Sequence, residues 1–263
     1  MSVPNKLLAL LVVFFCGYSS ASELSPKDLV LAVQRNASPA DEQVEIDMLL
    51  VDKEGSSNRR TATFYQRQRE PGSDQDMRLI RFSSPAEMDG SAVLTLENKG
   101  RADDQWLYLP AYHTSRKIPS SNRSDRYMGT DFFYEDVSDD KVELYDFSLI
   151  SKDSLEGRDY LIVEQIPKDA QLKKETFYGK KRLWIDPERL VTGRIDFYDK
   201  AGELIKRMSS SAPQLIEKRW RMNQVEMTDF RITHKTTINY HNRKLDQGLN
   251  TQMFTVRSLE RGR

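Results

Sequence analysis

Residues 44–50 read Val-Glu-Ile-Asp-Met-Leu-Leu, with apolar side chains at every second position from Val44 to Leu50. Because successive side chains of a β-strand point to opposite faces, a period of two predicts a strand with one buried face. The same alternation returns in four further runs, at residues 61–65, 79–82, 92–96 and 106–109. Turns that contain glycine, such as residues 53–55, separate these runs. The first half of the chain is therefore predicted to form neighbouring antiparallel strands.

The pattern resumes after an irregular polar stretch at residues 120–126. Further strands are predicted at residues 145–150, 160–166, 182–185, 189–198, 203–209, 214–227 and 232–240. Residues 199–202, Asp-Lys-Ala-Gly, are typical of a hairpin turn between two of them. The second half of the chain is therefore also predicted to be a series of antiparallel strands.

Few segments have a helical pattern. A helix is predicted at residues 26–36, with Ser25 as its cap, and a short helix or turn at residues 131–136. Residues 252–260 are predicted to form a final strand or a helical turn. A sheet of about ten or more strands curls, and its edges must be closed or covered. We therefore predict a mainly β protein, a curved antiparallel sheet in an unclosed half-barrel with a few covering helices. Residues 22–263 would form this single domain.

The N-terminus has the pattern of a secretory signal peptide. Lys6 precedes an apolar run at residues 7–15, and the small residues 19–21 follow. The run is about half of the roughly 18–20 residues that a membrane span needs. We expect cleavage after residue 21, a periplasmic protein, and no transmembrane segment after cleavage. Lipidation of Cys16 is the alternative, but Phe15 stands where that reaction needs a small residue.

The composition excludes several classes of function. The 263 residues include 40 Lys and Arg and 40 Asp and Glu, so the formal net charge is 0. A nucleic-acid-binding protein would have a basic excess, so we expect no nucleic-acid partner. One Cys and three His leave little material for a zinc site or a thiol enzyme. We expect no catalytic residue, no metal and no cofactor. A hydrolase would require His113, His234 or His241 beside a Ser and an Asp.

The segments that carry a family resemblance are Phe82-Ser83-Ser84-Pro85-Ala86-Glu87-Met88-Asp89-Gly90, Trp106-Leu107-Tyr108-Leu109-Pro110-Ala111, Met128-Gly129-Thr130-Asp131-Phe132-Phe133-Tyr134-Glu135-Asp136, Trp184-Ile185-Asp186 and Phe197-Tyr198-Asp199-Lys200-Ala201-Gly202. Together they resemble the LolA-like, outer-membrane lipoprotein-sorting family of periplasmic proteins. The resemblance implies an unclosed barrel with helices over its concave side, and lipid or acyl chains bound in the hollow. It also implies a partnership with an inner-membrane transporter of the resistance-nodulation-division (RND) type.

A hydrophobic cavity needs apolar walls, because each buried CH₂ group of an acyl chain contributes about 0.8 kcal/mol. The candidate wall residues are Ile46, Met48, Leu50, Phe64, Leu79, Leu94, Leu96, Trp106, Tyr108, Tyr145, Phe147, Leu161, Val163, Phe197 and Trp220. The flexible side chains of Met48, Met208, Met222 and Met227 would suit varied acyl shapes. The alternative is that these residues fill an ordinary core.

The acidic and aromatic segment at residues 131–136 is the candidate lid or gate. Its members are Asp131, Phe132, Phe133, Tyr134, Glu135 and Asp136, with Arg116, Lys117, Arg123 and Arg126 as candidate cationic partners. The two phenylalanines would plug the cavity. The alternative is an ion-pair network that fixes a loop.

The sequence thus predicts a periplasmic carrier of lipid or acylated protein, which is not an enzyme and works with an RND-type transporter. The alternative is an envelope adaptor or sensor that binds a transporter or a peptide through the same fold.

Overall fold

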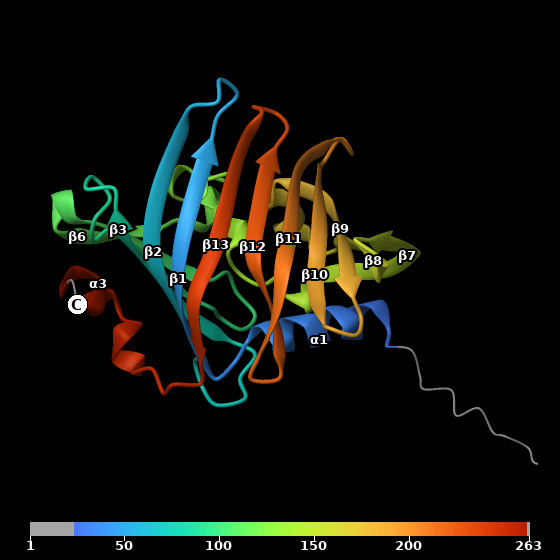
Figure 1. Ribbon diagram of the computed structural model, residues 1–263, viewed down its shortest axis with the longest axis horizontal. Helices are drawn as coiled ribbons and strands as arrows, with labels where there is room; N and C mark the ends of the chain where they lie inside the picture. Colours follow the sequence, from blue (N-terminus) through green and yellow to red (C-terminus); the bar gives the residue numbers. More distant parts are fainter. Residues whose placement is uncertain (1–23, 262–263) are drawn as a thin grey trace, which may run out of the picture.

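The computed structural model describes residues 24–261 and shows one 13-stranded antiparallel sheet (Figure 1). The predicted signal peptide, residues 1–21 with Cys16, lies outside the described residues. The strand order is β6-β5-β4-β3-β2-β1-β13-β12-β11-β10-β9-β8-β7, and β6 and β7 are the unpaired edges. The predicted fold class, mainly β with a sheet that is not closed into a barrel, is confirmed.

The first half of the sheet runs from its centre to one edge. Its strands are β1 (Asp41–Val51), β2 (Ser57–Gln68), β3 (Asp76–Ser84), β4 (Ala92–Leu96), β5 (Asp104–Leu109) and β6 (Thr114–Ile118). The second half runs from the opposite edge back to the centre. Its strands are β7 (Tyr145–Leu155), β8 (Arg158–Pro167), β9 (Tyr178–Asp186), β10 (Val191–Asp199), β11 (Leu204–Ile216), β12 (Arg219–Asp229) and β13 (His234–Leu245). The two halves join where β13 pairs with β1.

Residues 119–144, which we call the strap, connect the two edges of the sheet. The strap leaves β6 at one edge, crosses behind the strands in the view of Figure 1, and enters β7 at the other edge. It contains short 3₁₀ turns at Ser120–Asn122, Tyr127–Gly129, Tyr134–Asp136 and Val142–Leu144. The face of the sheet that the strap crosses is the concave face of the half-barrel.

Three α-helices accompany the sheet. The predicted N-terminal helix is confirmed as α1 (Pro26–Ala37), and the Ser25 hydroxyl accepts a hydrogen bond from the backbone N–H of Asp28 at 3.2 Å. The other helices are α2 (Ala170–Glu175) and α3 (Val256–Arg261). Helix α1 packs its buried face against β8 and β9 on the concave side.

The two faces of the sheet carry separate hydrophobic cores. On the concave face, strap aromatics pack against β1 residues such as Val44 and Ile46. On the opposite face, Phe254 and Leu259 of the C-terminal segment pack against Leu79, and β4 and β5 contribute to the same cluster. Because side chains alternate along a strand, β3 and β4 contribute to both cores.

Some element boundaries differ from the sequence predictions. Strand β11 joins the predicted strand at residues 203–209 to the start of the one predicted at residues 214–227, and a turn at residues 217–218 divides the latter between β11 and β12. Pro213 is tolerated in β11 because the pairing with β10 ends at Ser209, so this part of the strand has no neighbour on that side. Strand β6 and helix α2 were not predicted. Of the two alternatives for residues 252–260, the helical turn is correct.

Candidate functional site

The strap is tied to the sheet by carboxylates that reach different strands. Asp131 lies at the first of these ties. Its carboxylate accepts a hydrogen bond from the Thr236 hydroxyl at 2.6 Å and lies 2.6 Å from Nδ1 of His234, both on β13. Arg126 of the strap completes the cluster with an ion pair of 2.5 Å to Asp131. This group fixes residues 126–131 of the strap to the centre of the sheet.

The same cluster bears on the hydrolase alternative. Among the described hydrogen-bond partners of His234 there is an Asp but no Ser, and the Thr236 hydroxyl donates to Asp131 rather than to the imidazole. His113 lies in an exposed turn, and His241 is an exposed partner of Asp47. The arrangement that the hydrolase hypothesis requires is therefore not assembled in the described residues.

The middle of the strap is tied by a buried ion pair. Asp136 lies 2.7 Å from the ammonium of Lys206 on β11, and the Lys206 side chain is 0% exposed. Asp136 also accepts a hydrogen bond from the Tyr178 hydroxyl at 2.9 Å. Burial lowers the pKa of Lys206, although the Asp136 charge opposes this shift. The ammonium lies 3.4 Å from the centre of the Phe133 ring, so a cation–π contact adds to the tie.

Two further strap carboxylates bind the second half of the sheet. Glu135 accepts a hydrogen bond from the Thr176 hydroxyl at 2.7 Å, and burial raises the pKa of Glu135. Asp140 lies 2.6 Å from the ammonium of Lys181 and accepts a hydrogen bond from Gln165 at 2.7 Å. Burial opposes the ionisation of Asp140, but Lys181 and the hydrogen bonds outweigh it and lower the Asp140 pKa. The strap is therefore anchored along its length.

The predicted gate residues lie within this strap. Phe132, Phe133 and Tyr134 are buried in the concave-side core, and they fill the hollow over the centre of the sheet. Of the four candidate cationic partners, two do pair with the segment, namely Arg123 with Glu135 at 3.3 Å and Arg126 with Asp131. The other two do not pair with the segment. Arg116 lies over the Tyr112 ring, and Lys117 forms an ion pair with Asp104. Whether this segment moves as a gate stays a prediction.

A hollow remains beneath α1, and we call it the α1 hollow. It has a volume of about 180 Å³ and lies between α1 and the concave face of β8 to β12. Its apolar lining includes Val33 of α1 and Ile195, Phe197, Met208 and Met227 of the sheet. The Asp140–Lys181 ion pair forms part of its polar boundary. The geometry is that of a small apolar site under a helical cover.

The predicted wall residues divide into groups. Five lie in the core on the concave face, namely Ile46, Met48, Leu50, Phe64 and Phe197. Phe147, Leu161 and Val163 belong to the core beneath α1, and Tyr145 contacts Phe147 with ring centres 6.3 Å apart. Trp220 is half-buried with the Arg189 guanidinium 4.3 Å from its ring centre. Phe197 is the one predicted wall residue that lines the α1 hollow itself.

Five predicted wall residues require a correction. Leu79, Leu94, Leu96, Trp106 and Tyr108 lie on the opposite face of the sheet, against the C-terminal segment. The physical reason is that β3, β4 and β5 are covered on both faces, so an apolar residue does not reveal which face it is on. The sequence prediction also omitted several lining residues of the α1 hollow, among them Ile195 and Leu183. The apolar stripe of the predicted N-terminal helix could have identified the helical cover of the α1 hollow, because Val30 and Val33 of that stripe line the hollow.

Two larger cavities adjoin the α1 hollow. One of about 600 Å³ lies at the C-terminal end of α1, and one of about 350 Å³ lies on the α2 side of the strap. Asp139 and Asp140 line all three. Residues 138–143 of the strap therefore separate the three spaces.

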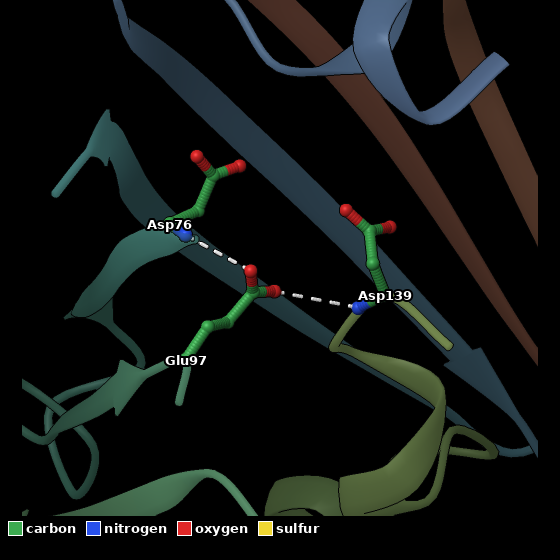
Figure 2. Close-up of side chains that lie close together, drawn as sticks. All are labelled: Asp76, Glu97 and Asp139. Carbon is green, nitrogen blue, oxygen red and sulfur yellow. Dashed lines mark hydrogen bonds between the residues drawn. The ribbon is translucent and has the colours of Figure 1, made fainter. Parts of the chain in front are cut away.

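An acidic cluster lies at the wall of the 600 Å³ cavity. Figure 2 shows the Glu97 carboxylate between Asp76 and Asp139, accepting hydrogen bonds from their backbone amides at 2.9 and 3.5 Å. The oxygens of the three side chains lie within 4.8 Å of one another. The guanidinium of Arg78 bonds all three carboxylates, at 2.9 Å to Asp139 and 3.4 Å to Asp76. Arg78 thus supplies one positive charge to this cluster of three carboxylates.

Burial and the neighbouring charges shift the pKa values of Glu97, Asp76 and Arg78 in this cluster. Burial raises the pKa of Glu97 to about 7, with Arg78 opposing the shift and the two aspartates adding to it. Burial likewise raises the pKa of Asp76, against the effect of Arg78. For Arg78, burial favours the neutral form, but the three carboxylates outweigh it and raise its pKa.

Solved structures with a similar fold include proteins from three bacteria. A DUF1329 family protein from Desulfovibrio piger is 28% identical, with a TM-score of 0.83 over 90% of this chain and 100% of that chain. A putative outer membrane lipoprotein-sorting protein domain from Vibrio parahaemolyticus is 28% identical, with a TM-score of 0.82 over 89% and 98%. A LolA superfamily protein from Nitrosomonas europaea is 19% identical, with a TM-score of 0.68 over 89% and 98%, and shows the fold alone. No curated protein matches the chain.

The open sheet, the crossing strap and these likenesses define a LolA-like fold, as the sequence resemblance predicted. A family model with the description "-like: Uncharacterized protein" matches residues 74–261. The chain belongs to that family. In the described residues, no helix is both long enough and apolar enough to cross a membrane.

Proposed function

We propose that this protein is a periplasmic carrier that binds lipid or lipoprotein acyl chains between α1 and the concave face of the half-barrel. The observation that carries the proposal is the apolar α1 hollow under a helical cover. The likeness to the lipoprotein-sorting domain from Vibrio parahaemolyticus supports the same class of cargo. In this proposal residues 1–21 direct export and are removed, residues 22–263 act as one domain, and the protein is not an enzyme.

Loading requires α1 to move. The α1 hollow of about 180 Å³ is smaller than the roughly 300–1,000 Å³ of typical ligand sites. Gln34 of α1 lines both this hollow and the 600 Å³ cavity, so a displacement of α1 would join the two. The polar ties of α1 gather at its C-terminal half, where Gln34 donates to the backbone oxygen of Asp140 at 2.8 Å and Asn36 to that of Leu190 at 3.1 Å. Arg219 and Arg221 of β12 donate to the last carbonyls of the helix, so the N-terminal half of α1 is the part that can swing away. An acyl chain would replace the apolar contacts that α1 loses.

Direction would come from partners at the membranes. We place an RND-type transporter at the inner membrane, because the family resemblance implies that association. The carrier itself binds at equilibrium and needs no cofactor. Its mobile cover opens to let a long chain pass and closes to exclude water.

Val33→Glu is expected to weaken the binding of a fluorescent C16 fatty acid by about tenfold or more. The substitution places a carboxylate in the apolar lining of the α1 hollow, where an acyl chain would leave it without water or a partner. Fluorescence titration of the purified protein measures the affinity, and native mass spectrometry of protein from the envelope identifies bound lipid.

Two variants control this measurement. Val33→Leu keeps the lining apolar and is expected to keep binding, and Lys27→Glu adds an acid on the exposed face of α1 without effect. Circular dichroism checks that each variant is folded. If the wild-type protein neither carries lipid from the envelope nor binds the fatty acid, the carrier proposal fails.

A second candidate function is an envelope adaptor or sensor that binds a transporter or a peptide. The observation that favours it is the filling of the central concave face by the strap aromatics. Affinity capture from the envelope distinguishes the two functions. One stable protein partner together with lipid-free protein is the result expected for an adaptor.

A further inference from the structure

We propose that Arg78, Asp76, Glu97 and Asp139 form a proton-sensitive latch. With a proton on the cluster, the latch holds residues 138–143 of the strap against the wall of the 600 Å³ cavity. Loss of that proton releases these residues and opens the cavity toward α1. The inference goes beyond the carrier proposal, because the latch would act whatever the protein carries.

The latch joins three separate segments. Asp76 and Arg78 stand at the start of β3, Glu97 follows β4, and Asp139 belongs to the strap. Two contacts of the cluster cross from the sheet to the strap, namely the ion pair from Arg78 to Asp139 at 2.9 Å and the hydrogen bond from the Asp139 amide to Glu97 at 3.5 Å. Lys141 ties the strap separately, to the backbone oxygens of Asn98 and Arg101. The ion pair depends on the charge of the cluster, because an ionised Glu97 competes with Asp139 for the Arg78 guanidinium and repels the Asp139 carboxylate. A change in that charge therefore acts on the attachment of the strap.

The charges in the cluster do not balance. Three carboxylates face one guanidinium, and among the described residues Arg78 is the one cation within 4.0 Å of any of them. When all three carboxylates are ionised, the cluster has two excess negative charges in a largely buried place. Like charges at this distance disfavour one another, and a proton on Glu97 relieves half of the excess. The raised pKa of Glu97, about 7, agrees with this reading of the geometry.

The neighbouring groups do not supply the missing charge. Ser38 and Gln66 donate hydrogen bonds to Asp76, but both are neutral. The nearest strap cation, Lys141, is paired with Asp103 at 3.1 Å, and Lys181 is committed to Asp140.

Other charged side chains line the same cavity. Toward α1 they are Arg35 and Arg219, at the rim they are Lys99 and Asp74, and on the strap they are Glu143 and Asp140. None of these is within ion-pair distance of the cluster in the described residues, so they leave its imbalance in place.

Asp139 is the member that can leave. Its side chain is 41% exposed, whereas those of Asp76 and Glu97 are 2% and 8% exposed. It also lies on an irregular part of the strap, between two 3₁₀ turns, while the other two are held by the sheet. Repulsion in the ionised cluster therefore moves the strap rather than the strands. Because the next residue, Asp140, accepts the hydrogen bond from Gln34, the movement also loosens the end of α1.

The size of the effect follows from proton linkage. In the closed cluster the Glu97 pKa is about 7, against an ordinary value of 4.5. If opening restores the ordinary value, opening releases one proton, and its equilibrium constant rises by up to about tenfold for each pH unit between these values. The constant should level off above the pKa of the closed cluster.

Hydrogen exchange of the full chain tests the latch. Exchange of the amides of residues 138–143 is measured by mass spectrometry from pH 5 to pH 8 and divided by the intrinsic chemical rate at each pH. The corrected exchange of the wild-type protein is expected to rise by about one to two orders of magnitude between pH 5 and pH 7 and then to level off. Glu97→Gln, which mimics the protonated form, is expected to keep slow exchange at every pH.

Two further variants complete the test. Asp139→Asn removes one of the repelling charges, which lowers the excess from two to one, and is expected to flatten the pH profile. Asp74→Asn alters an exposed acid of the same cavity and is expected to behave as the wild type. A flat profile for the wild type, or an unchanged pH profile in both Glu97→Gln and Asp139→Asn, overturns the latch. Lipid binding is not part of this readout, so failure of the carrier proposal would not imitate either result.

Discussion

Arg78→Met is expected to lower the free energy of unfolding by about 3–5 kcal/mol at pH 7.5. The substitution removes the cation that bonds Asp76, Glu97 and Asp139 and leaves three carboxylates together in a largely buried place. Urea denaturation followed by circular dichroism measures the loss. Arg101→Met is the matched control, because Arg101 is an exposed partner of Asp104, and this substitution should leave the free energy of unfolding close to that of the wild type.

The deficit, which is the free energy of unfolding that Arg78→Met loses relative to the wild type, should depend on pH. Without the guanidinium, the folded-state pKa values of Asp76 and Glu97, which burial already raises, rise further above their unfolded values. A carboxyl group of this kind contributes stability that is fully present below its unfolded pKa and is lost as the pH rises through its folded pKa. The deficit is therefore expected to be smaller at pH 5 than at pH 7.5. A loss of less than 1 kcal/mol at pH 7.5, or a larger loss at pH 5, would contradict this account of the cluster.

Asp136→Asn is expected to have an effect of similar size, again about 3–5 kcal/mol. The variant leaves the fully buried ammonium of Lys206 without its counter-charge, although the amide oxygen can still accept hydrogen bonds. The double variant Asp136→Asn with Lys206→Met is expected to recover most of the loss, because a buried charge no longer remains. Thermal and urea unfolding of both proteins measure the difference.

Glu226→Gln is the control for the Asp136 experiment. Glu226 pairs with Lys235 at 3.2 Å on an exposed part of the sheet, so this substitution should change stability by less than about 1 kcal/mol. If the double variant were as unstable as Asp136→Asn alone, the loss would come from the strap contacts of Asp136 and not from the charge of Lys206.

The alternation of apolar residues predicted the strands well, because it reports a local property of the chain. Residues 44–50 lie within β1, and Val44, Ile46, Met48 and Leu50 do face one side. The same signal cannot assign a side where both faces are covered. In β3, Leu79 and Ile80 are adjacent and both buried, one beneath the C-terminal segment and the other beneath the strap.

The strap was the part of the candidate site that the sequence described least well. Its acidic residues have the composition of a surface loop, and one sequence does not reveal which distant strands they reach. Asp136 is buried because Lys206 is nearby in the fold, and Asp140 because Lys181 is. Such long-range pairs are set by the topology of the sheet. The cluster around Arg78 was missed for the same reason, since its members come from separate segments.

The pairing of β1 with β13 has a consequence for the rate at which the protein folds. Within each half of the sheet, every strand pairs with its neighbour in sequence, so those hairpins can form early and locally. The central pairing instead brings Ile46 opposite Tyr240, across most of the chain. Contacts between residues so far apart in sequence slow the search for the native state. Two halves that have formed but have not yet paired at this central junction would expose unpaired strand edges, so newly synthesised chains would be most vulnerable to aggregation before the junction forms.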